Sequence, residues 1–146
     1  MATTAQTVFD YAMGLIDEVN AAGETDTTAT AEYKVRALFI LNILRGELYQ
    51  YSDGYLSVTS GIRPISTVLT ALTDSVGVDD FLAQTIMPYG LAAHLLIDEN
   101  PKAASFFQSR YDELLARYGA NTPSEFTDIT QTYGGFNVGD YYEDEE

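Results

Sequence analysis

Few residues in this chain have the chemistry of a catalytic or metal-binding group. The sequence contains no cysteine and one histidine, His94, so thiol chemistry and cysteine-ligated metals are excluded. His94 lies in an apolar stretch, where a lone histidine is more typical of a core or interface residue than of a base or a ligand. None of the zinc-protease, phosphate-loop, dinucleotide or calcium-loop motifs occurs. The sequence therefore predicts no enzyme and no cofactor.

Adjacent carboxylates are the second candidate for chemistry. Asp79 and Asp80 could act as an acid/base pair or bind a hard cation, but they directly precede an apolar run. Aspartate in that position can cap the first turn of a helix, and we interpret the pair in that way. Asp98 and Glu99 lie at a predicted turn and are interpreted as a solvated corner. No metal site is expected.

Charge is the strongest compositional signal. Twenty-two acidic residues against seven basic ones give a net charge of −15, which excludes a general DNA-binding surface because such a surface is basic. The excess either serves solubility or keeps a nearby polyanion from adhering. Five of the acids lie in Asp140–Glu146. With no apolar run near the ~20 residues of a membrane span and no basic leader, we expect a soluble protein.

The elements that must position these residues are helices of a single domain. A first helix is predicted from about Thr4 to Asn20 and a second over about Ala29–Tyr51, each from apolar residues at helical spacing. The second helix has two apolar stripes, and Phe39 and Ile43 form the smaller one. We favour a helix enclosed inside the domain. The alternative is that Phe39 and Ile43 contact a neighbouring subunit.

The rest of the chain is organised around Asp79–Tyr118, which has the pattern of a helical hairpin. Its first arm is apolar on all sides, so we expect burial from several directions, with a kink at Pro88. Pro101 can begin the second arm, and Gly119 is predicted to end it in the left-handed conformation. The side chains that lie off the apolar stripe of this arm, and that we expect to contact a partner, are Phe106 and Arg110.

Two segments carry no helical pattern. Ser52–Val78 combines glycine and proline with β-forming residues, and we expect a long extended loop packed on the helices, of the kind that orders on binding a partner. Residues 120–146 form a predicted flexible acidic tail after a body of residues 1–119. Its aromatic residues are interpreted either as anchors that bury in a partner or as part of a frayed end; they are Phe136, Tyr141 and Tyr142. The predicted fold is mainly α, a four-helix-type bundle that includes the C-terminal hairpin.

Two stretches of the sequence resemble a known class of protein. The first stretch combines an alanine- and leucine-rich arm, an acidic turn and an arm with aromatic, Arg-Tyr and Leu-Leu pairs; it reads DDFLAQTIMPYGLAAHLLIDENPKAASFFQSRYDELLARYG. It resembles the head–tail connector proteins, also called adaptor or neck proteins, of tailed bacteriophages. The upstream run YKVRALFILNILRGELYQYSD resembles segments of prophage proteins of similar length. The resemblance spans roughly Tyr33–Tyr118, and the very acidic terminus departs from many members of the family.

The resemblance implies a structural protein of the virion neck, assembled in the cytoplasm of the bacterial host. In that family a homo-oligomeric ring, commonly dodecameric, stacks under the portal protein and receives the tail or a stopper protein. DNA passes through the lumen without sequence recognition. An acidic lumen would repel phosphates over roughly the 8 Å Debye length of physiological salt. C-terminal segments and long loops of the family often reach into the adjoining ring.

Two other classes stay open. An acidic DNA-mimic inhibitor would place its carboxylates in rows along one face, whereas the acids here lie at caps and turns and in the tail. A phage assembly chaperone would hold an apolar helix of its partner. The surplus of apolar side chains outside the expected core favours an assembly over a monomer.

Overall fold

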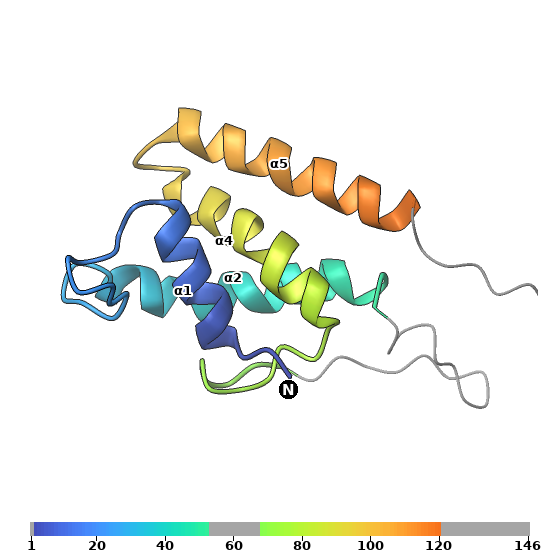
Figure 1. Cartoon of the computed structure of the whole chain (residues 1–146), viewed down its shortest axis with the longest axis horizontal. Helices are drawn as coiled ribbons and strands as arrows, with labels where there is room; N and C mark the ends of the chain where they lie inside the picture. The colour runs from blue at the N-terminus through green and yellow to red at the C-terminus, as the bar shows by residue number, and fades with distance from the viewer. Residues whose placement is uncertain (1, 53–67, 121–146) are drawn as a thin grey trace, which may run out of the picture.

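The computed structural model describes residues 2–52 and 68–120, which form four α-helices and one π-helix (Figure 1). The elements are α1 (Ala5–Leu15), α2 (Ala31–Tyr49), η1 (Leu82–Ile86), α4 (Met87–Leu96) and α5 (Pro101–Ala120). The predicted mainly α-helical class is confirmed for these residues. None of the described helices is both long and apolar enough to cross a membrane.

The centre of the fold is α4. It packs against α1, α2 and α5 (Figure 1), and together with η1 it supplies fully buried side chains to the core. These are Leu82, Ile86, Met87, Leu91 and Leu95. The expectation that this apolar arm is buried from several directions is confirmed.

Gly90 allows three helices to meet closely. A Cβ atom placed on it would lie 2.9 Å from Leu44 Cδ2 of α2 and 3.0 Å from the ring of Tyr111 of α5. Carbon atoms in good contact are about 3.5–4.0 Å apart, so a side chain at this position would push both neighbours away from α4. The missing side chain therefore helps to set the spacing of the three helices.

A π-helical turn lies directly before Pro88, where the sequence predicts a kink. Proline has no backbone N–H, and its ring crowds the carbonyl one turn earlier, here that of Gln84. The chain accommodates this by letting the N–H of Met87 donate to the carbonyl of Leu82, five residues back instead of four. Pro88 then falls in the first turn of α4, where a missing donor is tolerated.

The first helix is shorter than predicted. Thr4 caps its start by accepting a hydrogen bond from the N–H of Thr7 (3.3 Å), but α1 ends at Leu15 instead of about Asn20. Asp17 has a φ of 63°, a left-handed conformation that stops the helix and that aspartate tolerates better than most residues. The bounds of α2, in contrast, agree with the prediction within two residues at each end.

Residues 68–78, the described part of the predicted extended loop, pack against the N-terminal segment. The N–H of Val76 donates to the carbonyl of Thr3 (2.9 Å), and the N–H of Ala5 donates to the carbonyl of Asp74 (3.0 Å). These bonds hold the segment against the start of α1, and Figure 1 shows it in green beside the N-terminus. The expected packing on the helices is confirmed for these residues, but residues 71–74 form a turn, closed by a hydrogen bond from the N–H of Asp74 to the carbonyl of Ala71 (3.1 Å), instead of extended chain.

The last described helix, α5, begins at Pro101 as predicted and continues through Ala120. Gly119 lies inside it without a positive φ, so its predicted role as the residue that ends the helix is wrong. A Cβ atom on Gly119 would contact the ring of Tyr51 at 3.5 Å, which shows that this last turn packs on the chain after α2. The remainder of the predicted loop (residues 53–67) and the predicted acidic tail (121–146) lie outside the described residues.

Candidate functional site

His94 is exposed and lies outside the core. It lines a shallow groove of about 250 Å³ between α4 and α5, together with Ile97 and Pro101. The expectation of a core histidine is therefore wrong, because the side chain is exposed at the edge of this groove, while an interface role stays a prediction. Among the described residues, no group of three or more histidine and carboxylate side chains is placed to hold a metal ion.

The adjacent carboxylates tie distant parts of the chain together. Asp80 accepts hydrogen bonds from the backbone N–H (3.0 Å) and the hydroxyl (2.5 Å) of Thr3. These bonds hold the pKa of Asp80 below its ordinary value because they favour the charged carboxylate. Asp79 accepts a hydrogen bond from the hydroxyl of Tyr118 in α5 (3.1 Å). These hydrogen bonds make the pair two structural ties between distant segments, whereas the predicted role in capping a helix stays a prediction.

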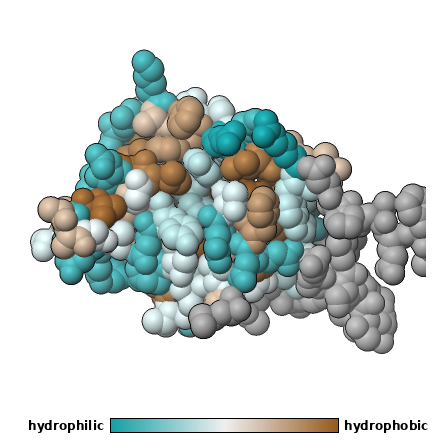
Figure 2. Space-filling view, viewed as in Figure 1, coloured by the Kyte–Doolittle hydropathy of each residue, from teal (hydrophilic) through white to brown (hydrophobic). Residues whose placement is uncertain are grey.

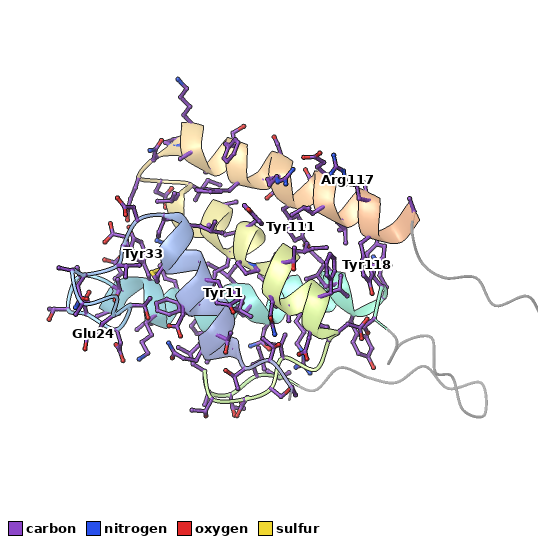
Figure 3. All side chains as sticks on the ribbon, in the orientation of Figure 1. Tyr11, Glu24, Tyr33, Tyr111, Arg117 and Tyr118 are labelled. Carbon is purple, nitrogen blue, oxygen red and sulfur yellow. The ribbon has the colours of Figure 1, made fainter. Side chains whose placement is uncertain are left out.

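Tyrosine hydroxyls join helices at two further places (Figure 3). Tyr33 of α2 donates to Glu99 in the turn between α4 and α5, and this bond is the main reason that the pKa of Tyr33 rises to about 12. Tyr111 of α5 donates to Glu47 of α2 (3.1 Å); burial, followed by the charge of Glu47, raises the pKa of Tyr111. Because a raised pKa keeps each phenol protonated at neutral pH, both hydroxyls act as hydrogen-bond donors, and we interpret these contacts as structural.

Two of the polar side chains that line a cleft of about 430 Å³ between α1 and the η1–α4 segment already form hydrogen bonds within the chain. Gln84 donates to the hydroxyl of Thr3 (2.8 Å), and Asp10 accepts from Gln6 (2.8 Å). A small-molecule site normally offers convergent polar groups that orient the ligand. Because Gln84 and Asp10 are engaged within the chain, we assign no ligand to this cleft.

The outward face of α2 carries a line of exposed apolar side chains, which we call the α2 stripe: Val35, Phe39 and Ile43. Their exposed fractions are 68%, 71% and 61%. Residues four apart lie on one side of a helix, so the three side chains form one continuous strip. Gly46 continues it, with open space around its α-carbon. The favoured interpretation, that α2 is enclosed on both stripes, is therefore wrong.

A second segment with an exposed apolar side chain is held beside α2. The side-chain amide of Asn42 accepts from the N–H of Leu69 (2.8 Å) and donates to its carbonyl (3.1 Å), which fixes residues 68–69 beside α2. Val68 is 74% exposed. Nothing in the sequence pattern indicated that this residue lies next to the stripe, because the contact bridges residues that are far apart in the chain.

The outer face of α5 forms a separate surface. Phe106 is 64% exposed and lies edge-on to the ring of Phe107. Arg110 pairs with Glu113 (2.6 Å), which also pairs with Arg117 (2.5 Å). Exposed ion pairs of this kind contribute little to stability, and the surface is best described as one aromatic ring beside a short row of charges.

The predicted contact residues thus lie on two different helices. Phe39 and Ile43 lie on α2, whereas Phe106 and Arg110 lie on α5. The predicted anchors of the tail, Phe136, Tyr141 and Tyr142, lie outside the described residues. On the face shown in Figure 2, apolar side chains gather in separate patches among polar ones.

Comparison of the chain with protein-family models, with curated proteins and with solved structures finds no match.

Proposed function

We propose that this protein is a structural subunit without enzymatic activity that assembles with copies of itself. The observation that carries this proposal is the α2 stripe, in which three large apolar side chains remain more than half exposed in the single chain. Single exposed apolar residues are ordinary, but a contiguous strip of them marks an interaction surface.

The outer face of α5 supports an assembly larger than a pair. Closed rings need heterologous contacts, in which one surface of a subunit meets a different surface of the next. The α2 stripe and the Phe106 face are two such surfaces, on different helices. We propose that the ring contact joins these two surfaces, the α2 stripe of one copy and the Phe106 face of the next.

The particular assembly that we propose is the head–tail connector ring of a tailed bacteriophage, on the strength of the sequence resemblance. In this interpretation α4 and α5 are the C-terminal hairpin of a four-helix-type bundle, and the acidic tail reaches a neighbouring ring. The portal protein and a tail or stopper protein are the expected partners. The α1–α2 loop and the α4–α5 turn lie toward the same end of the molecule (Figure 1), where the Tyr33–Glu99 bond ties the start of α2 to the turn, and both segments carry acidic residues. That end is a candidate for the wall of a DNA channel.

Electron microscopy of the purified full chain, alone and mixed with the portal protein encoded in the same genome, tests this function. We expect ring-shaped particles, or a subunit layer added to the portal ring. The matched control is Phe39→Asp, which places a charge in the α2 stripe. A wild-type chain that never forms rings and never joins a portal would contradict the connector proposal.

A further inference from the structure

The α2 stripe has a symmetry that points to its occupant. The stripe is nearly symmetric about Leu41. Phe39 lies two residues before Leu41 and Ile43 lies two residues after it. Val35 lies six residues before Leu41, and Gly46 lies five residues after it. A helix with this spacing can face an identical antiparallel helix, so that Phe39 of each copy meets Ile43 of the other. Gly46, with open space around it, would then receive Val35.

The charged residues along the stripe follow the same symmetry. Arg36 lies five residues before Leu41 and Glu47 six residues after, and helical spacing places both on the same edge of the stripe. In an antiparallel pair related by a two-fold axis, equivalent edges of the two helices meet. Arg36 of each copy would therefore face Glu47 of the other, and opposite charges would come together twice.

Both members of this pair are available within the described part of the chain. Arg36 is half-buried and forms no ion pair among the described residues. Glu47 is exposed and accepts one hydrogen bond from Tyr111, and a carboxylate can accept several. Glu32 and Gln50, each nine residues from Leu41, would form a polar pair at the two ends of the contact.

We infer that the α2 stripe is covered by the α2 stripe of a second copy, in an antiparallel, two-fold symmetric pair. The inference rests on the proposed function only in treating the stripe as a contact between copies. A two-fold contact joins two subunits and cannot itself continue around a ring. The pair is therefore the form of the unassembled subunit, in which the apolar stripe is shielded from water until a ring forms.

Cysteine cross-linking of the full chain tests the register directly, because the native sequence has no cysteine. Phe39→Cys and Ile43→Cys chains are mixed in equal amounts under mild oxidation, and the products are separated by mass. We expect the mixed disulfide to exceed either self-disulfide by about fivefold or more, and an Ala22→Cys control, exposed in the α1–α2 loop, to cross-link with neither. A dominant Phe39→Cys self-disulfide would indicate parallel helices and would overturn the inference.

Charge reversal tests the ion pairs independently of cross-linking. Arg36→Glu and Glu47→Arg should each weaken pairing several-fold, measured by sedimentation, because each variant brings like charges together twice. The double variant should restore pairing to within about threefold of the wild type. Tyr111→Phe is the control for the lost Glu47 hydrogen bond and should leave pairing unchanged. Failure of the double variant to recover, with Tyr111→Phe normal, would overturn the antiparallel arrangement.

The outcomes separate this inference from the proposed function. If Phe39→Asp leaves the oligomer intact, the α2 stripe is not the contact, although rings formed through other surfaces would still support a connector. If the wild-type chain pairs in the register described here but never forms rings or joins a portal, the pairing stands and the connector proposal fails.

Discussion

Replacing Gly90 by alanine tests the packing at the centre of the fold. In most helices this change is favourable, because glycine costs about 1 kcal/mol relative to alanine in a helix interior. At Gly90 the new methyl group would lie 2.9 Å from Leu44 Cδ2 and 3.0 Å from two carbons of the Tyr111 ring. The methyl group of Leu44 can rotate away. The ring of Tyr111 has less freedom, because its hydroxyl is held by Glu47.

The two contributions oppose each other. Overfilling a packed core costs about 1–3 kcal/mol, which exceeds the propensity gain of about 1 kcal/mol. We therefore expect Gly90→Ala to lower the free energy of unfolding by roughly 0–2 kcal/mol. The matched control is Gly14→Ala, because Gly14 also lies in a helix but a Cβ atom added there would have nothing within 4 Å. That variant should gain up to about 1 kcal/mol.

Urea unfolding followed by circular dichroism measures both variants, each at two protein concentrations, because self-association makes apparent stability depend on concentration. The test is the sign of the change in the free energy of unfolding relative to the wild type, which should be a loss for Gly90→Ala and a gain for Gly14→Ala. If Gly90→Ala were stabilised as much as Gly14→Ala, the close approach of α2, α4 and α5 would be wrong.

Three further results are expected. Asp80→Asn should be less stable than the wild type at pH 7, and the difference in stability should shrink as the pH falls below about 4. The reason is that the lowered pKa of Asp80 contributes stability only while the carboxylate is charged. Equal denaturation midpoints of the two proteins at pH 7 would argue against the hydrogen bonds between Asp80 and Thr3. Absorbance titration should show Tyr33 ionising at a pH near 12. A raised tyrosine pKa adds stability that is lost as the pH rises through the raised pKa. Tyr33→Phe should therefore remove both this late ionisation and part of the alkaline unfolding. Leu91→Ala should cost about 2–5 kcal/mol in chemical denaturation because Leu91 is fully buried, and a loss below about 1 kcal/mol would place α4 at the surface.

Hydrophobic spacing predicted the helices where local signals and packing agree. Pro101 marks the start of α5, and the apolar positions of α2 fix its bounds within two residues. The predicted end of α1 was too late because Val19 continues the apolar spacing, whereas the chain turns at Asp17 in a left-handed conformation. The prediction for Gly119 failed for a related reason: glycine permits a helix end but does not require one, and here packing on Tyr51 keeps it helical.

The candidate surfaces were harder to derive from sequence than the helices. Two apolar stripes on α2 could be recognised, but whether the second lies inside the fold depends on how the other helices pack. The bond between Thr3 and Asp80 and the pairing of Asn42 with Leu69 join residues distant in sequence. No local pattern encodes such contacts, because they depend on the packed fold.

Sedimentation velocity of the full chain over a range of about 1–200 µM, compared with Phe39→Asp, tests self-association through the α2 stripe most directly. We predict that the wild-type chain sediments as species heavier than the 16.0 kDa monomer as concentration rises, and that the variant shifts toward the monomer while retaining its helical circular dichroism. A wild-type chain that remains monomeric over the whole range would contradict the proposed self-assembly.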